Sequence, residues 1–138
     1  MCQLDRFIVA QDQCFDNVIQ ELNNNRKRTH WIWYIFPQCA GLGSSSTSIK
    51  YSIKSKQEAI DYLSNQILYD RLITCCNILL KSENHNIKDI LGFPDDFKFK
   101  SCLTLFMNVN PKNLIFKTLL DKYFKGQECS QTRNFLCL

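Results

Sequence analysis

The chain of 138 residues has the length of one domain, and we expect a single helical domain over residues 1–138. Apolar residues make up 45% and charged residues 22%, which are the proportions of a globular protein and exclude a disordered tail or a fibre. The net charge of +4 is mild and scattered apart from Arg26-Lys27-Arg28. That triplet is too short for a nucleic-acid footprint, so nucleic acid is not an expected partner.

The sequence carries neither a membrane signature nor a metal signature. Its longest apolar run, from Trp31 to Pro37, is far shorter than the roughly 20 residues that span a bilayer. The first residues lack the basic-then-apolar layout of a signal peptide, so we expect a cytoplasmic protein with no membrane partner. The eight cysteines form no Cys-x-x-Cys pair and the two histidines form no zinc half-site, so we expect buried thiols, no metal and no cofactor. The oligomeric state stays open.

The first part of the chain predicts one long and one short helix. Apolar side chains at steps of three and four predict an amphipathic helix over residues 3–22, which Asn23-Asn24-Asn25 ends. Thr29 is the candidate N-cap of a short segment from His30 to Phe36, which Pro37 closes. We favour helix over buried strand for this segment because the sequence offers no partner strand of equal quality.

A loop and a capped helix follow. Residues 38–48 are rich in glycine and serine and predict a loop. The capping box Ser55-Lys56-Gln57-Glu58 opens a helix that we expect to turn Ala59, Ile60 and Leu63 inward.

The second half of the chain predicts the remaining helices. The first is an amphipathic helix from Leu68 to Leu80, and a short turn from Ile87 to Leu91 follows, which Gly92 ends. The next helix has Pro94 as its first residue and runs to about Met107. A further helix is capped by Asn110, has Pro111 at its first position and is stopped by Gly126, and Ser130 caps a last turn. Six or seven helices are therefore expected to pack as one compact all-α domain.

The first candidate site lies between Lys27 and Ser45. A cation, an imidazole and two indoles there precede the loop Gly41-Leu42-Gly43-Ser44-Ser45. Free N–H groups of such a loop can cradle an anion, and an indole beside it can stack on a nucleotide-like ligand. The alternative is that both indoles are core, His30 has a structural hydrogen bond and the loop is a tight crossing. Gly-Leu-Gly alone matches no phosphate-binding motif.

The second candidate site is Pro94-Asp95-Asp96, followed by Lys98 and Ser101 on one helical face. If that face meets His30, a carboxylate there can join it in acid–base chemistry, for which histidine is the natural proton carrier near neutral pH. The alternative makes the acids helix caps and the serine a close-packing residue.

Several motifs are distributed along nearly the whole chain: Asp5-Arg6-Phe7, Lys27-Arg28-Thr29-His30-Trp31-Ile32-Trp33 through Phe36-Pro37-Gln38, Gly41-Leu42-Gly43-Ser44, Pro94-Asp95-Asp96 with Lys98, and Asp121-Lys122-Tyr123-Phe124. Together they resemble the domain of unknown function 1810 family. The resemblance implies a compact all-α fold and no established activity. Family members usually carry a small polar residue where this chain has Phe93, so the helix at Pro94 is expected to lack a side-chain N-cap.

Two hypotheses of function follow. In the first, the chain binds or processes a small anionic ligand, phosphate-bearing and nucleotide-like, in a pocket formed where the two candidate sites meet. In the second, it is a non-catalytic protein-interaction or structural module whose aromatic residues are core or a hot spot. We favour the first, without deciding whether the protein is an enzyme. The predicted catalytic residues are His30, Asp95 and Asp96, and the predicted ligand-binding residues are Arg28, Trp31, Trp33, Gln38, Gly41, Gly43, Ser44, Lys98 and Ser101.

Overall fold

The computed structural model describes residues 3–138, and within that range it contains nine helices and no extended strand. They are α1 (Asp5–Asn23), α2 (Ile32–Ile35), α3 (Ser46–Lys50), α4 (Lys56–Ser64), α5 (Gln66–Lys81), α6 (Ile87–Leu91), α7 (Asp95–Val109), α8 (Ile115–Phe124) and α9 (Ser130–Phe135). The predicted all-α class is confirmed. The predicted number of six or seven helices is too low, in part because α3 begins inside the segment predicted to be a loop and extends two residues beyond it.

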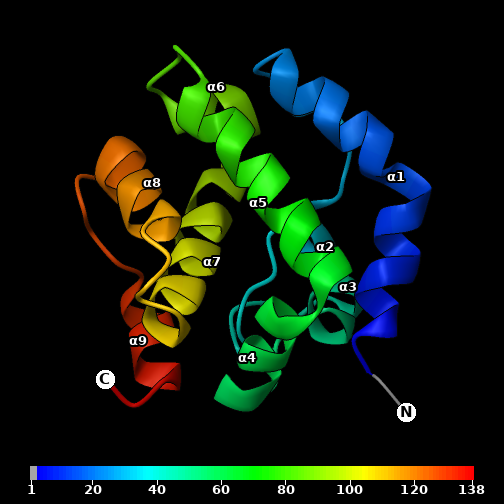
Figure 1. Cartoon of the computed structure of the whole chain (residues 1–138), viewed down its shortest axis with the longest axis vertical. Helices are drawn as coiled ribbons and strands as arrows, with labels where there is room; N and C mark the ends of the chain where they lie inside the picture. The colour runs from blue at the N-terminus through cyan, green and yellow to red at the C-terminus, as the bar shows by residue number, and fades with distance from the viewer. Residues whose placement is uncertain (1–2) are drawn as a thin grey trace.

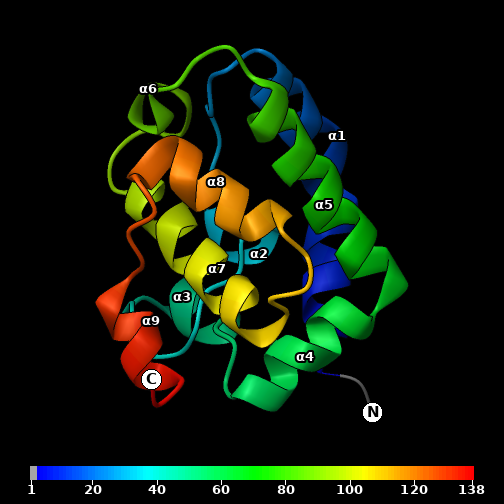
Figure 2. The same cartoon turned by 60° about the vertical axis from the view of Figure 1, so that its left-hand side comes forward.

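Helix α7 is the centre of the molecule and packs against α2, α4, α6, α8 and α9. Figure 1 shows α5 running between α1 on one side and α7 and α8 on the other, and Figure 2 shows α8 lying across α7. Because α7 is covered on most sides, it buries eight residues around its whole circumference.

Aromatic rings join the outer helices to α7. The ring of Phe7 on α1 meets Tyr62 on α4 edge-on at 5.2 Å, and Tyr62 lies 5.3 Å from Phe106 on α7. Phe36, directly after α2, lies 4.6 Å from Phe99 on the same central helix. All five side chains are fully buried, so they fix α1, α2 and α4 against α7.

Helix α4 begins as predicted, but one of its side chains faces outward. The Ser55 hydroxyl accepts a hydrogen bond from the Glu58 backbone N–H at 3.1 Å, which is half of a capping box. Ala59 and Tyr62 form the buried face of the helix. The prediction that Ile60 points inward is wrong: it is exposed, because the large Tyr62 side chain occupies the core-facing position three residues after Ala59.

Four predicted helix starts differ from the structure. Helix α2 begins at Ile32, not at His30, and Thr29 does not cap it because the Thr29 hydroxyl donates to the Glu21 carboxylate. Pro94 precedes α7 instead of opening it, and, as expected, it provides no side-chain cap. Helix α8 begins at Ile115, not at Pro111, because the Asn113 side chain accepts a hydrogen bond from the Ile115 N–H at 3.2 Å. Ser130 is the first residue of α9 and does not cap it.

The cysteines are free thiols in the described part of the chain, and Cys2 lies outside it. Burial raises the pKa of Cys75 to about 12 and also raises the pKa of Cys76 and Cys102, so these three are protonated and act as small apolar residues. None of the helices within residues 3–138 is both long and apolar enough to cross a membrane.

Candidate functional site

The segment after α1 is held in place by one buried carboxylate, Glu21. Its two oxygens accept hydrogen bonds from the backbone N–H of Arg28 at 2.7 Å and of Thr29 at 3.1 Å, from the Thr29 hydroxyl at 2.7 Å, and from the Trp31 indole N–H at 3.0 Å. Burial alone would raise the pKa of Glu21, but these hydrogen bonds to the charged form outweigh it and lower the pKa to about 2. Glu21 thereby fixes the part of the first candidate site from Arg28 to Trp31.

A cavity of about 220 Å³ opens beside this segment, where it faces Thr47 on α3 and the first turn of α7. We call it the lysine–indole cavity. Most of its wall comes from a single stretch of chain, and the rest comes from the α7 residues Asp95 and Lys98. The residues of that stretch are Lys27, His30, Trp31, Ile32, Trp33 and Tyr34.

Two lysines share one carboxylate in this cavity. The Lys27 ammonium lies 2.7 Å from one oxygen of Asp95, and the Lys98 ammonium lies 3.5 Å from the other. The Lys27 side chain is only 5% exposed, whereas that of Lys98 is 28% exposed. Two positive charges against one negative charge leave the cavity with a net positive charge.

Each lysine also lies over an indole ring. The Lys27 ammonium is 4.9 Å from the centre of the Trp31 ring, and the Lys98 ammonium is 4.9 Å from the centre of the Trp33 ring. Cation–π contacts of this kind are worth about 0.5–2 kcal/mol, more when water is excluded. The two cations are therefore held at fixed places along the cavity wall.

The structure brings five of the predicted site residues to this cavity: His30, Trp31, Trp33, Asp95 and Lys98. Trp31 is also core, because it is 1% exposed, whereas Trp33 is half-buried. The first hypothesis requires the two candidate sites to lie side by side. The Lys27–Asp95 ion pair and the contact of Lys98 with the Trp33 ring join them.

The other predicted residues lie elsewhere. The Asp96 carboxylate is buried and accepts a hydrogen bond from the neighbouring Phe97 N–H, and the Ser101 hydroxyl donates to the Phe97 carbonyl oxygen. Arg28 lines a separate depression near Glu21. Gln38 is 1% exposed, and its side-chain nitrogen has no hydrogen-bond partner. Gly41, Gly43 and Ser44 do not line the cavity.

The glycine loop nevertheless affects the cavity, because it packs against the wall residue Trp33. A Cβ at Gly43 would lie 2.9 Å from the edge of the Trp33 ring and 2.7 Å from the Ser48 Cβ, so the loop can pass close to the indole only with glycine there. Gly41 has a positive φ of +95° and open space around it. The loop therefore positions Trp33.

We expect Gly43→Ala to lower the free energy of unfolding by about 2 kcal/mol and to displace Trp33, because the added methyl group overlaps two side chains. Trp31 is buried, so acrylamide quenching of fluorescence in the variant reports mainly on Trp33. Gly41→Ala is the matched control: its backbone strain costs stability, but quenching should not change. Equal quenching in the wild type and Gly43→Ala would contradict the positioning role.

Sequence reasoning missed three contributors to the site: Glu21, Tyr34 and Thr47. Lys27 stands in the basic triplet and at the start of the first candidate site, but it is not among the predicted ligand-binding residues. In the structure Lys27 turns inward to Asp95, which leaves Arg26 and Arg28 exposed. No local pattern links Lys27 to Asp95, because that pairing depends on how α6 and α7 return past the end of α1.

Two other features of the molecule support this location of the site. A depression of about 530 Å³ between the end of α1 and α5 is larger, but its lining includes one charged residue, Lys81, and no aromatic ring. Within residues 3–138, no three histidine, cysteine or acidic side chains are grouped so that they could hold a metal ion.

Fold and cavity together define an all-α protein with a small positive cavity walled by indole rings. Residues 1–136 match the model of a family described as "Protein of unknown function (DUF1810)", and the chain belongs to that family. It is also similar to the crystal structure of the conserved hypothetical protein Rv1873 from Mycobacterium tuberculosis, with 40% sequence identity over 98% of this chain and 96% of that chain and a TM-score of 0.95. The comparison with curated proteins finds no match.

Proposed function

We propose that the protein binds a small phosphate-bearing, nucleotide-like molecule in the lysine–indole cavity. The observation that carries this proposal is the convergence of two ammonium groups, from Lys27 and Lys98, on the single carboxylate of Asp95. Lysine is a common phosphate ligand because its ammonium group is a compact charge with three donors. An anion entering the cavity meets one uncompensated positive charge.

The two lysines have different roles in the proposal. Lys27 is nearly inaccessible, makes the shorter contact with Asp95, and also donates to the Thr29 carbonyl oxygen at 2.6 Å. Lys98 is more exposed and its contact with Asp95 is longer. Lys98 is therefore the cation that can turn to a phosphate, while Lys27 keeps Asp95 in place.

The aromatic wall and His30 complete the proposed site. Trp33 offers a half-buried indole, on which a sugar or base can pack. His30 is exposed and lines the cavity, and its imidazole is the group that we assign to any proton transfer there. Asp95 contacts both lysines and so has a positioning role. The Asp96 carboxylate accepts a hydrogen bond from the backbone at the start of its own helix. The proposal concerns binding and carries no reaction type.

The test is a calorimetric titration and thermal-shift series with inorganic phosphate, ribose 5-phosphate and adenosine 5′-monophosphate. A ligand at 100 times its Kd should stabilise the wild type by about 2.7 kcal/mol. Lys98→Ala should weaken binding about tenfold or more, because a charge-assisted hydrogen bond is lost. Two controls change cations that do not line the cavity: Lys100→Ala, on the same helix as Lys98, and Arg28→Ala, in the same basic triplet as Lys27. Equal weakening in the controls, or no stabilisation by any probe, would refute the proposal.

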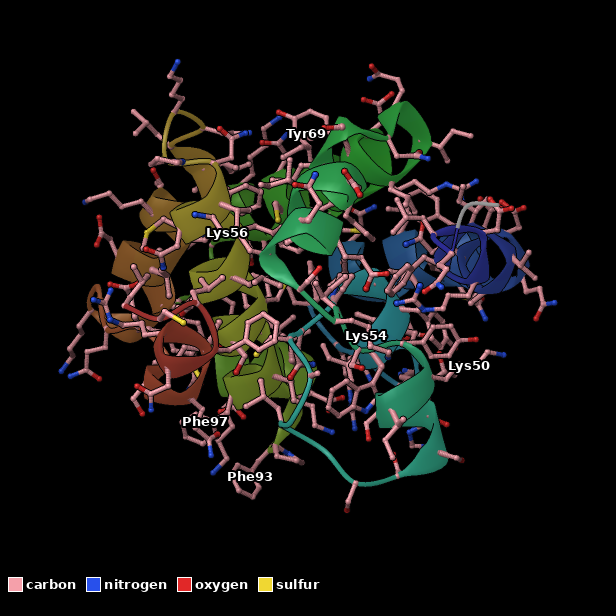
Figure 3. All side chains as sticks on the ribbon, turned by 90° about the horizontal axis from the view of Figure 1, so that it is seen from below. Lys50, Lys54, Lys56, Tyr69, Phe93 and Phe97 are labelled. Atoms are coloured by element: carbon pink, nitrogen blue, oxygen red, sulfur yellow. The ribbon has the colours of Figure 1, made fainter. Side chains whose placement is uncertain are left out.

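A separate observation favours the protein-interaction hypothesis. Phe93 and Phe97 are 67% and 53% exposed and meet edge-on at 5.7 Å. Figure 3 shows both rings projecting from the molecule near the start of α7. Exposed aromatic pairs are frequent at protein contacts. If the phosphate probes fail to bind, this surface becomes the leading candidate for function.

A further inference from the structure

A second cavity shares one wall residue, Tyr34, with the lysine–indole cavity. It measures about 570 Å³ and is lined by residues of α1, including Cys14, and by Lys50 and Tyr51 at the end of α3. We call it the tyrosine groove. Thr47, also on α3, lines the first cavity, so α3 and Tyr34 contribute to the walls of both cavities.

The lysine–indole cavity is too small for a whole nucleotide. Small-molecule pockets usually measure about 300–1,000 Å³, whereas this one measures about 220 Å³. It can enclose a phosphate and part of a sugar, and the rest of the ligand must then leave through the opening. The tyrosine groove, which shares the wall residue Tyr34 with it, would supply the missing volume.

The charge of the groove differs from that of the first cavity. Arg6 is paired with Glu58 at 3.1 Å, and the other charged lining residues, Asp5 and Lys50, have opposite signs. The groove is thus close to neutral. A neutral groove suits the uncharged part of a nucleotide and not a second phosphate.

The groove also offers aromatic surface that is held rigidly. The rings of Tyr34 and Tyr51 lie 5.0 Å apart at 57°. The Tyr34 hydroxyl donates to the His30 carbonyl oxygen at 2.9 Å, and the Tyr34 carbonyl oxygen accepts from the buried Gln11 amide at 2.7 Å. A ring fixed at both ends loses little freedom when a base stacks on it.

We infer that the ligand is a nucleoside 5′-phosphate whose phosphate lies at Lys98 and whose base lies on Tyr34 and Tyr51. This inference rests on the proposed function. Gln13, an exposed residue of α1 that lines the groove, is placed to offer its carboxamide to the edge of the base. Such an amide can donate and accept at the same time, which suits a heterocyclic edge.

The test compares the affinities of adenosine and guanosine 5′-monophosphate with that of ribose 5-phosphate by calorimetry. The wild type should bind at least one nucleotide about tenfold more tightly than ribose 5-phosphate, since one stacked base contributes about that much. Tyr51→Leu should remove this advantage without changing the affinity for ribose 5-phosphate. Tyr51→Phe, which keeps the ring, should retain it, and Gln13→Ala should reduce it with no loss of folding.

Tyr69→Leu is the matched control, because Tyr69 lies on α5 outside both cavities, away from Lys50 (Figure 3). If nucleotides and ribose 5-phosphate bind equally well, and both need Lys98, the inference is wrong while the proposed function stands. If Tyr69→Leu abolishes the advantage as well as Tyr51→Leu does, the inference is also wrong. Failure of all the probes to bind the wild type would overturn both.

Discussion

Replacing Glu21 with Gln is expected to lower the free energy of unfolding by about 3 kcal/mol at neutral pH. The carboxylate accepts four hydrogen bonds, and a glutamine would turn an N–H₂ group toward donors of Thr29 or Trp31. Breaking such a charged, buried set of bonds costs about 2–4 kcal/mol. Urea unfolding of both proteins measures the difference, and Glu83→Gln, at an exposed glutamate, is the control.

The effect of Glu21→Gln should depend on pH. The pKa of Glu21 is lowered in the folded protein from its usual 4.5 to about 2. The carboxylate therefore stabilises the fold fully above about pH 4.5, and this contribution is lost as the pH falls from 4.5 toward 2. The stability difference between wild type and variant should be largest at pH 7 and smaller at pH 3. A difference that does not change with pH would show that the carboxylate charge is not what holds the segment.

Asp95→Asn is the second change with a large expected effect, because it leaves Lys27 without its charged partner. The Lys27 side chain is 5% exposed, and a buried charge that loses its counter-ion costs about 3 kcal/mol. We expect a loss of stability of about that size in thermal or urea unfolding. The same change adds positive charge to the cavity, so inorganic phosphate should stabilise Asp95→Asn more than it stabilises the wild type.

A double-mutant cycle with Lys27→Met separates this effect from a general loss of packing. Methionine has a similar length to lysine and no charge, so Lys27→Met/Asp95→Asn should recover much of the loss caused by Asp95→Asn alone. Additive losses in the double variant would mean that the short Lys27–Asp95 contact contributes no coupling. Asp89→Asn, at an exposed aspartate on α6, controls for the loss of a negative charge.

The candidate site was only partly predictable. The sequence indicated a chemistry-bearing stretch at His30, Trp31 and Trp33 and a second one at Asp95 and Lys98, and these five residues line one cavity in the structure. It assigned ligand-binding roles to Gln38 and Ser101, whose side chains are buried away from that cavity. A polar residue type in a motif does not tell which way the side chain points, and burial decides that.

The sequence by itself determined the helices whose signals are local. The apolar periodicity of α1, the Ser55 cap of α4 and the turn at Gly92 depend on residues within about four positions of one another, so they could be read directly. Only the tertiary structure decided that Lys27 turns inward to Asp95, that Glu21 accepts four hydrogen bonds, and that Tyr34 lines two cavities. The Lys27–Asp95 pair joins residues distant along the chain, and the Glu21 hydrogen bonds join residues seven to ten positions apart across an irregular segment, so neither leaves a periodic trace in the sequence.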